Sequence, residues 1–397
     1  MTVAWIYDQP LNPEAGGTER ITSLVAKGLE SCGHTCLGIL VFDHATGKVR
    51  YSAPDGGREV EVKDLYGFLQ EHGVDVVINQ IAYAKWLLEA FLKQGGARWR
   101  AEGGRIVSCH HFNPETPPLS DFYRSLLRKT WRDRINYAKS LLLAPYYKRR
   151  HEREEGEVFR YIYDHSDAFV TLSAGYHPYV KRVMGRSELP KLKAINNPLT
   201  FDTVLTAADM AQKKKEVLVC SRIVEYQKRI SLVLKIWEKV RRNPVSDDWT
   251  LKIVGEGKDK AYYVDYARRK GLTNIEFLDR QDPMPHYRTA SMLMLTSNRA
   301  EGWGLTLTES LQTGTVPLAF DTYAAVREII QDGENGFLLR DGDLDGYAKA
   351  VTGLMANPAR LTQLQLAALR SADRFSPAST TPKWQSLLHE IGNGRKQ

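Results

Sequence analysis

The stretch SNRAEGWGLTLTESLQTGT, residues 297–315, joins a polar loop to a helix in a pattern typical of an α/β protein. It follows the apolar run Met292–Leu295, which predicts a strand, and helical spacing begins at Leu305. In open parallel sheets, ligands bind at the carboxyl ends of the strands. The loop after Leu295 is therefore a candidate ligand-binding loop.

Two glycines and two glutamates give this loop its chemistry. Gly302 and Gly304 let the backbone approach a ligand closely, and the free N–H groups from Gly304 to Thr306 can hold a phosphate with the help of the helix dipole. Glu309 lies about one turn into the helix, where its carboxylate can accept hydrogen bonds from ribose hydroxyls, and Glu301 can reach a neighbouring sugar. Acidic residues also favour a helix N-terminus for structural reasons alone, so a simple helix cap is the alternative.

Short apolar runs alternate with amphipathic ones through the chain, which predicts βα units on parallel sheets. This alternation stops at residues 201–215 and then restarts. The run Lys213–Lys215 within that segment is interpreted as a solvated linker or helix end. The predicted strands are Val3–Tyr7, Thr35–Val41, Val74–Asn79, Arg105–Cys109, Ala168–Leu172, Leu192–Ile195, Val217–Ser221, Thr250–Val254, Asn274–Leu278, Ser291–Leu295, Val316–Phe320 and Gly336–Leu338. The predicted helices include Thr18–Glu30, Ala84–Lys93, Ile230–Arg241, Lys260–Lys270, Leu305–Gln312, Ala325–Gln331 and Leu344–Met355.

We therefore predict an α/β fold with two Rossmann-like domains that face each other across a cleft. The 397 residues are too many for one ordinary core. The first domain is expected at residues 1–205 and the second at residues 206–375. Residues 376–397 are expected to form a C-terminal helix that packs back on the first domain.

Composition sets further limits on the class of protein. No apolar run of about 18 residues could span a bilayer, and the start MTVAWIYDQP lacks the features of a signal peptide. The cysteines Cys32, Cys36, Cys109 and Cys220 are few and scattered, which favours a reducing cytoplasm over a disulfide framework. The net charge of +8 favours anionic partners.

Two cations follow the first predicted strand of the second half. Arg222 offers a planar fork and Lys228 a point charge, and together they can stabilise a diphosphate leaving group. Solvated surface cations are the alternative interpretation.

The first half carries two further candidate positions. Gly16 and Gly17 open a predicted helix, where they can approach a phosphate or a sugar. His110 and His111 follow the predicted strand Arg105–Cys109, and one of them is expected to face the ligand. Neither GxGxxG nor GxxxxGK[ST] occurs, which argues against dinucleotide-binding and P-loop proteins.

In this order, over nearly the whole chain, these residues resemble the family 4 retaining glycosyltransferases, which have the GT-B fold of two Rossmann-like domains. The specific part is the Glu301–Glu309 pair within EGWGLTLTES. The other matching segments are Gly16-Gly17, His110, Ser221-Arg222 with Lys228, Val254–Gly257 and Asn335–Leu338.

The resemblance implies a retaining enzyme that moves a hexose-type sugar from a nucleotide-diphosphate sugar to a hydroxyl of a glycan or lipid-linked acceptor, in cell-envelope polysaccharide or glycolipid synthesis. The first domain would bind the acceptor and the second the donor. The implied catalytic residues are His110, Arg222, Lys228 and Glu301. The implied donor-binding residues are Gly16, Gly17, Gly255, Glu256, Gly302, Gly304, Leu305, Thr306 and Glu309.

Each implied role follows the family's pattern. Arg222 and Lys228 would bind the diphosphate, Glu309 the ribose, Glu301 the transferred sugar, and His110 the hydroxyls on its reactive face. The amides near Leu305 and Thr306 would touch the distal phosphate. Gly255 and Glu256, which follow the predicted strand Thr250–Val254, would shape the pocket for the nucleotide base. The leaving diphosphate would itself accept the proton of the attacking hydroxyl.

The chain departs from the family at three points. Trp303 stands where Phe is commoner. The spacing from Arg222 to Lys228 is one residue longer than in many members, so Arg229 is an alternative to Lys228. His111 stands where Asp often follows the family histidine, which leaves the register of the histidine contact open.

No metal and no other cofactor is expected, because cationic side chains can stabilise the diphosphate charge. The sequence Asp341-Gly342-Asp343 matches the letters of a metal-binding DxD motif, but it follows the strand predicted at Gly336–Leu338 and predicts a turn before a helix.

Residues 124–150 carry nine Lys or Arg and a single acid, Asp133, interleaved with aromatic and aliphatic side chains. This pattern predicts an amphipathic basic helix that lies on an anionic membrane, or else a solvated basic face over a packed apolar stripe. The first interpretation would place a cytoplasmic protein peripherally on the inner face of the membrane.

Two other function classes compete with a glycosyltransferase. A nucleotide-sugar epimerase or a phosphorylase could use the same fold. The pI of about 9.1 also suggests a nucleic-acid-binding protein, but no helix-turn-helix, zinc or RNA-recognition signature supports that class, so nucleic acid is not an expected partner.

Overall fold

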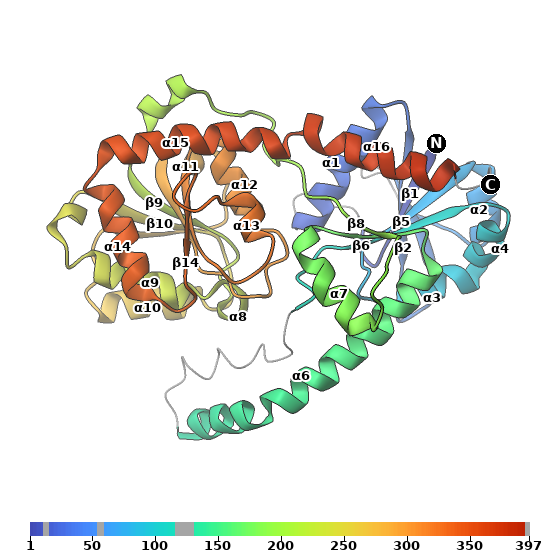
Figure 1. The fold of residues 1–397 in the computed structure, drawn as a ribbon, viewed down its shortest axis with the longest axis horizontal. Coiled ribbons are helices and arrows are strands. Elements are labelled where there is room, and N and C mark those ends of the chain that lie inside the picture. Colours follow the sequence, from blue (N-terminus) through green and yellow to red (C-terminus); the bar gives the residue numbers. More distant parts are fainter. Residues whose placement is uncertain (11–15, 54–58, 116–130, 394–397) are drawn as a thin grey trace. The chain divides into compact units, whose positions relative to one another are not determined.

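The computed structural model describes residues 1–10, 16–53, 59–115 and 131–393. Its contacts divide the chain into two compact units (Figure 1). Unit 1 consists of Met1–Pro114, Arg149–Thr200 and Phe375–Gln397, and unit 2 of Glu115–Lys148 and Phe201–Arg374. The predicted first domain, residues 1–205, included residues 115–148, which these contacts group with unit 2.

Unit 1 is built on an eight-stranded sheet in the order β4-β3-β2-β1-β5-β6-β7-β8. Its strands are β1 (Thr2–Tyr7), β2 (Thr35–Phe42), β3 (Val49–Ser52), β4 (Val60–Glu61), β5 (Val74–Asn79), β6 (Arg105–His110), β7 (Ala168–Thr171) and β8 (Leu192–Ala194). The strands from β2 through β1 to β8 pair in parallel, and their continuous apolar runs are buried on both faces, as is typical of parallel sheets. The short strands β3 and β4 are antiparallel additions at one edge that the sequence did not predict.

Helices cover the sheet of unit 1. They are α1 (Gly17–Ser31), α2 (Leu65–Glu71), α3 (Lys85–Phe91), α4 (Ala97–Ala101), α7 (His177–Met184), α16 (Pro377–Asn393) and the C-terminal half of α6 (Trp131–His165). The terminal helix α16 packs against α1, where Gly28 of α1 lies against the side chain of Thr381. Lys193 forms an ion pair with Glu390 of α16 at 2.7 Å, which adds a polar contact to this packing.

Unit 2 is built on a six-stranded sheet in the order β11-β10-β9-β12-β13-β14, and every strand pair is parallel. Its strands are β9 (Lys214–Cys220), β10 (Thr250–Val254), β11 (Ile275–Leu278), β12 (Ala290–Leu295), β13 (Val316–Phe320) and β14 (Phe337–Leu339). Its helices are α8 (Glu225–Lys228), α9 (Ile230–Val240), α10 (Lys260–Arg269), α11 (Met284–Thr289), α12 (Leu305–Gln312), α13 (Val326–Ile329), α14 (Leu344–Met355) and α15 (Pro358–Ala372).

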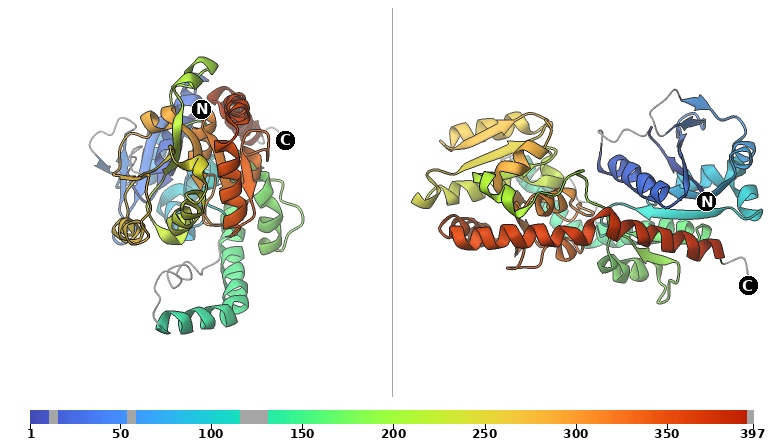
Figure 2. Two further views of the ribbon diagram at one scale, coloured as in Figure 1. Left: turned by 90° about the vertical axis from the view of Figure 1, so that its left-hand side faces the viewer. Right: turned by 90° about the horizontal axis from the view of Figure 1, so that it is seen from above.

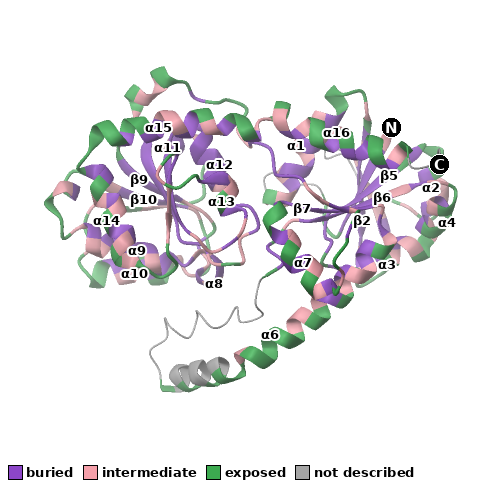
Figure 3. Ribbon diagram, in the orientation of Figure 1, coloured by how far each residue is buried: buried purple, intermediate pink, exposed green. Residues whose placement is uncertain are grey.

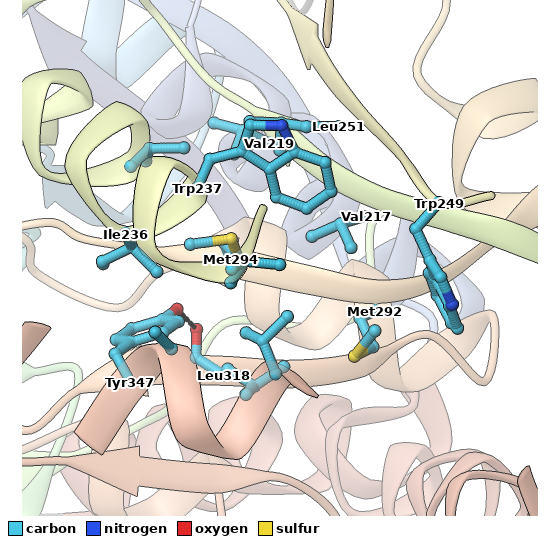
Figure 4. Close-up of a cluster of buried hydrophobic side chains, with 14 of the residues drawn as sticks. Val217, Val219, Ile236, Trp237, Trp249, Leu251, Met292, Met294, Leu318 and Tyr347 are labelled. Carbon is cyan, nitrogen blue, oxygen red and sulfur yellow. Dashed lines mark hydrogen bonds between the residues drawn. The ribbon is translucent and has the colours of Figure 1, made fainter. Parts of the chain in front are cut away.

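The core of unit 2 lies between its sheet and the helices α9 and α14. Figure 4 shows Trp237 of α9 and Tyr347 of α14 beside the central strands, together with Met294 and Leu318. The hydroxyl of Tyr347 donates to the carbonyl oxygen of Leu318, which satisfies its only polar atom inside the core. Figure 3 shows the central strands of both sheets as buried, so each unit has its own hydrophobic core.

Lys213 contradicts part of one prediction made from the sequence. The run Lys213–Lys215 was predicted to be a solvated linker or helix end. Lys213 does end a helix, as the C-cap of the 3-10 helix Ala207–Gln212, and Lys214 and Lys215 are exposed at the start of β9, but Lys213 is not solvated. The ammonium of Lys213 donates to the carbonyl oxygens of Tyr287 and Ala290 and to the hydroxyl of Thr315, at 2.8 Å each. Burial lowers its pKa to about 7. The prediction was wrong because a charge pattern does not reveal which backbone carbonyls need a donor.

Candidate functional site

The predicted site residues of unit 2 lie on loops at one edge of its sheet. The strands β10, β9 and β12 are neighbours. Arg222 and Lys228 follow β9, Gly255 follows β10, and the loop with Glu301 follows β12. Because all three strands are parallel, these loops leave the sheet at the same carboxyl edge, where an α/β sheet binds its ligands.

The loops after β9 and β10 touch backbone to backbone. Gly255 has a φ of +143°, and a Cβ there would collide with the carbonyl oxygen of Ser221. The amide of Ser221 donates to Val254 at 3.1 Å, and that of Ile223 to Glu256 at 2.7 Å. Gly255 is thus needed for the approach of the two loops, while the side chain of Glu256 is exposed.

The loop after β12 is held to the α8 segment by hydrogen bonds. The amide of Asn298 donates to the carbonyl of Gln227 at 2.9 Å, and the Gln227 side chain returns a bond to the carbonyl of Ala300 at 3.2 Å. The hydroxyl of Thr296 donates to the carbonyl of Lys228 at 2.7 Å. These bonds fix the position of the candidate loop relative to the two predicted cations.

Lys228 and Glu301 form an ion pair with 2.5 Å between Nζ and Oε2, and their side chains are only 11% and 12% exposed. Burial alone would raise the pKa of Glu301, but the charges of Lys228 and Arg222 hold it below its usual range. The site therefore holds a carboxylate and an ammonium in contact, each with lone pairs or protons to offer a ligand.

Arg229 has a different role from Lys228, although the two are adjacent. Its guanidinium is buried and donates to the carbonyl oxygens of Thr296 at 2.6 Å and Ser297 at 3.0 Å. It also pairs with Asp341 at 2.7 Å. The spacing left both residues as alternatives for the diphosphate. Lys228 is the one beside Glu301, whereas Arg229 holds the loop after β12 through its backbone carbonyls.

Arg222 is exposed at the end of β9. The guanidinium donates to the side chain of Gln227 at 3.4 Å, a long bond that leaves most of its donors available. Its charge also lowers the pKa of Glu301, which places it near the Lys228–Glu301 pair.

The N-terminus of α12 closes the site. Gly304 caps the helix at a φ of +83°, in the left-handed region that favours glycine, and Leu305 begins it. The hydroxyl of Ser297 lies beside the Glu301 carboxylate and helps to lower the pKa of that group. The buried hydroxyl of Thr306 has no hydrogen-bond partner among the described residues. Buried polar groups are rarely left unsatisfied, so this hydroxyl in the first turn of α12 indicates a place for a polar ligand. Glu309 is buried, one turn after Leu305.

Three predicted residues lie in unit 1, and His110 stands out among them. It ends β6 and is 3% exposed. Burial, with a smaller effect of His111, lowers its pKa to about 3, although the backbone of Ala82 acts in the opposite direction, so the ring is neutral. The neighbouring His111 contacts the side chain of Gln80. Both line a small cavity with Thr22, Asn196 and Asn197.

Gly16 caps α1 and Gly17 begins it. Glu19, which no sequence motif indicated as a site residue, lies beside these glycines. The carboxylate of Glu19, in the first turn, folds back to the position that a Cβ on Gly16 would occupy. Glu19 is buried, and after burial itself its charge and that of Asp8 raise the pKa of Tyr7. The signal that could have found it is the acid three residues after Gly16.

Over the described part of the chain, no three His, Cys, Asp or Glu side chains gather closely enough to hold a metal ion. Asp341, from the DxD-like sequence, instead pairs with Arg229.

Comparison with known proteins identifies the domain that carries these residues. Residues 206–370 match the family model described as glycosyl transferases group 1. They form a group 1 glycosyltransferase domain. This glycosyltransferase domain contains β9 to α14 and every predicted site residue of unit 2.

Relatives support this assignment. The chain is 23% identical over 197 residues to an uncharacterized glycosyltransferase of Haemophilus influenzae, covering 49% of this chain and 54% of that protein. It is 26% identical over 207 residues to the lipopolysaccharide 1,6-galactosyltransferase of Escherichia coli, covering 50% and 54%. The matched residues thus span only about half the length of these relatives.

A solved structure extends the likeness to the whole chain. HepE of Anabaena, in complex with UDP-glucose, matches with a TM-score of 0.68 at 15% identity, over 98% of this chain and all of that one (100%). The glycosyltransferase domain is therefore one of two parallel-sheet domains of a GT-B fold. The predicted fold class is confirmed.

Proposed function

We propose that the chain is a retaining glycosyltransferase that moves a hexose from a nucleotide-diphosphate sugar to a hydroxyl of a glycan or lipid-linked acceptor. The observation that carries the proposal is the grouping at the carboxyl edge of the unit 2 sheet: the Lys228–Glu301 pair, the exposed Arg222, and the α12 N-terminus with the hydroxyl of Thr306.

The diphosphate of the donor binds at the cations and the helix N-terminus. Arg222 and Lys228 supply full positive charges, and the first amides of α12, at Leu305 and Thr306, supply the partial charge of the helix dipole. Lys228 and the α12 amides are held in place before a donor arrives. They stabilise the charge that develops on the diphosphate as the sugar bond breaks.

The two glutamates orient the neutral parts of the donor. Glu309 accepts hydrogen bonds from the ribose, and Glu301, kept ionised by Lys228, accepts from hydroxyls of the transferred sugar. The complex of HepE with UDP-glucose supports a nucleotide-activated hexose as the donor.

Retention of configuration follows if the attacking hydroxyl approaches on the face of the sugar that the diphosphate leaves. The bond from the anomeric carbon to the diphosphate oxygen breaks, the bond to the acceptor oxygen forms, and the proton of the acceptor passes to the leaving diphosphate. His110, neutral and buried at the end of β6, binds sugar hydroxyls.

The acceptor belongs to the cell envelope. The lipopolysaccharide galactosyltransferase of Escherichia coli, a relative of this chain, acts on a cell-envelope glycolipid, as its name states. We propose a related glycan or glycolipid as the acceptor, with the chain working in the cytoplasm beside the membrane.

The test is to incubate the protein with UDP-, GDP-, ADP- and CDP-hexoses and a panel of envelope glycans. Released nucleoside diphosphate reports turnover, and proton NMR of the product reports its anomeric configuration. Turnover with one nucleotide and retention is the expected result. An inverted product would contradict the retaining mechanism. If the nucleotide sugar is epimerised and no sugar is transferred, the chain is an epimerase and not a transferase.

A further inference from the structure

The N-terminal half of α6 exposes large apolar side chains to solvent. Leu142 is 81% exposed and Tyr146 is 61% exposed. The other exposed apolar residues of this segment are Trp131, Ile135, Leu143 and Tyr147. Scattered apolar residues are normal on a protein surface, but a run of them on one helix marks an interaction surface.

The spacing of these residues places them together. Trp131, Ile135, Leu142 and Tyr146 stand at i, i+4, i+11 and i+15, which lie on one face of an α-helix. We call these four residues the α6 stripe. Pro145 lies inside the helix, and α6 bends along its length (Figure 2).

The α6 stripe is not required for the packing of its own helix. The C-terminal half of α6 buries Phe159 and Ile162, and the ring of Phe159 contacts Phe169 of β7 with 5.5 Å between centroids. Figure 3 shows the described parts of the N-terminal half as mainly exposed. The exposed side chains of the stripe therefore present apolar surface to water.

Positive charge surrounds the stripe. The sequence from residue 131 to residue 150 contains six Lys or Arg and a single acid. Lys139, Lys148 and Arg149 are exposed. Further along the helix the charges are balanced, because Arg150 pairs with Glu154, and Glu152 pairs with Arg182 of α7. The excess of cations therefore coincides with the apolar stripe.

We propose that the N-terminal half of α6 lies in the interface of an anionic bilayer, with the α6 stripe in the headgroup and acyl boundary and the cations on lipid phosphates. Apolar and aromatic side chains on one face, bordered by Lys and Arg, are the pattern of an interfacial helix. In the described part of the chain no helix is long and apolar enough to cross a bilayer, so α6 lies on the surface.

The same cations could meet a nucleic acid, but the stripe argues against that partner. Leu142 and Ile135 are aliphatic and cannot stack on bases. In a complex with nucleic acid these two side chains would therefore stay exposed to water. Insertion into lipid removes that apolar surface from water, which makes a bilayer the favoured occupant.

The experiment is flotation of the full chain with vesicles of phosphatidylcholine alone or mixed with phosphatidylglycerol, at low and high salt. The test variant is Leu142→Ser with Tyr146→Ser. The matched control is Tyr262→Ser with Val264→Ser, which removes two exposed apolar residues from α10. Neither pair belongs to the proposed donor site, so donor binding checks that each variant is folded.

We expect the wild type and the control to float with anionic vesicles and much less with neutral ones. The test variant should bind about tenfold more weakly or worse, because two apolar side chains no longer leave water. No flotation with anionic vesicles at low salt would overturn the proposal. Equal flotation of wild type and test variant would also overturn it, since charge alone would then bind. If the wild type forms a dimer but does not bind vesicles, and the test variant is a monomer, the stripe is instead the interface with a second copy of this chain.

Discussion

At the scale of single residues, two adjacent cations do different work. Lys228 forms a contact with Glu301 at the edge of the sheet, whereas Arg229 is buried and donates to the carbonyl oxygens of Thr296 and Ser297. Arg229 stands between α8 and α9 with a φ of +49°, whereas Lys228 is the last residue of α8. The sequence spacing left both residues as candidates for the diphosphate, and only the structure separates them.

Arg229→Ala should lower the free energy of unfolding by about 2–4 kcal/mol, because two buried carbonyls lose their donor and Asp341 loses its partner. Arg222→Ala is the control, since its side chain is exposed and should change stability by no more than about 0.5 kcal/mol. Urea unfolding of the three proteins measures both effects. Equal stability of all three would show that Arg229 does not support the loop.

His110 makes the stability of the protein depend on pH. Its pKa is lowered from 6.5 to about 3 in the folded state, so between these values the unfolded chain binds a proton that the folded chain does not. The free energy of unfolding must therefore fall as the pH falls through this window. His111, whose pKa burial lowers to about 4, acts in the same direction.

His110→Gln should remove part of this dependence. Between about pH 7 and about pH 5 the variant should lose about 1–2 kcal/mol less stability than the wild type, whatever its stability at pH 7. Denaturant unfolding at the two pH values measures the difference. If both proteins lose the same stability, the folded state protonates His110 and the ring is not held neutral.

At the scale of elements, the contact between the loops after β9 and β10 requires a residue without a side chain at position 255. Gly255→Ala would place a Cβ against the carbonyl oxygen of Ser221, at a φ of +143° that side chains rarely adopt. We expect a loss of about 2 kcal/mol or more. The matched control is Gly353→Ala in α14, where a Cβ meets open space and should stabilise the helix by about 0.5–1 kcal/mol. Thermal unfolding of both variants checks the contrast, and a Gly255→Ala protein as stable as wild type would refute it.

The sequence revealed the elements of the fold where apolar runs are long and buried. The strands predicted at Thr250–Val254 and Val316–Phe320 and the helix at Leu305–Gln312 have the same bounds in the structure. The antiparallel strands β3 and β4 were missed because they are short and carry polar residues at the edge of a sheet. Lys213 was placed wrongly because its acceptors come from Tyr287, Ala290 and Thr315, far away in the sequence.

The candidate site was predictable only in part. Motif and spacing indicated which loops of unit 2 carry chemistry, and parallel topology brings those loops to one edge. The contact of Lys228 with Glu301 and the backbone contact of Gly255 with Ser221 depend on packing between loops, which no local pattern encodes. Glu19 was overlooked because an acid in a first helical turn is common for structural reasons.

At the scale of the whole molecule, the GT-B fold combines a group 1 glycosyltransferase domain with a second α/β unit. The proposed chemistry needs a donor diphosphate whose charge is met by protein groups. In this proposal, Arg222, Lys228 and the α12 N-terminus are the groups that meet this charge.

Transfer should accordingly continue in the presence of a chelator. We expect EDTA to change the turnover rate by less than about twofold, because fixed cations already stabilise the leaving group. Nucleoside diphosphate release with and without EDTA measures this. A loss of activity that added Mg²⁺ or Mn²⁺ restores would contradict the expectation.

The most direct test of the donor site is a calorimetric titration of the wild type, Arg222→Ala and Arg268→Ala with UDP-, GDP-, ADP- and CDP-hexoses. Arg268 is the control, an arginine on α10 whose side chain is 78% exposed. We predict that one nucleotide sugar binds the wild type and Arg268→Ala alike, and binds Arg222→Ala about tenfold or more weakly, since a charged hydrogen bond to the diphosphate is lost. Binding of no nucleotide sugar, or equal binding by all three proteins, would contradict a donor site at this edge of the sheet.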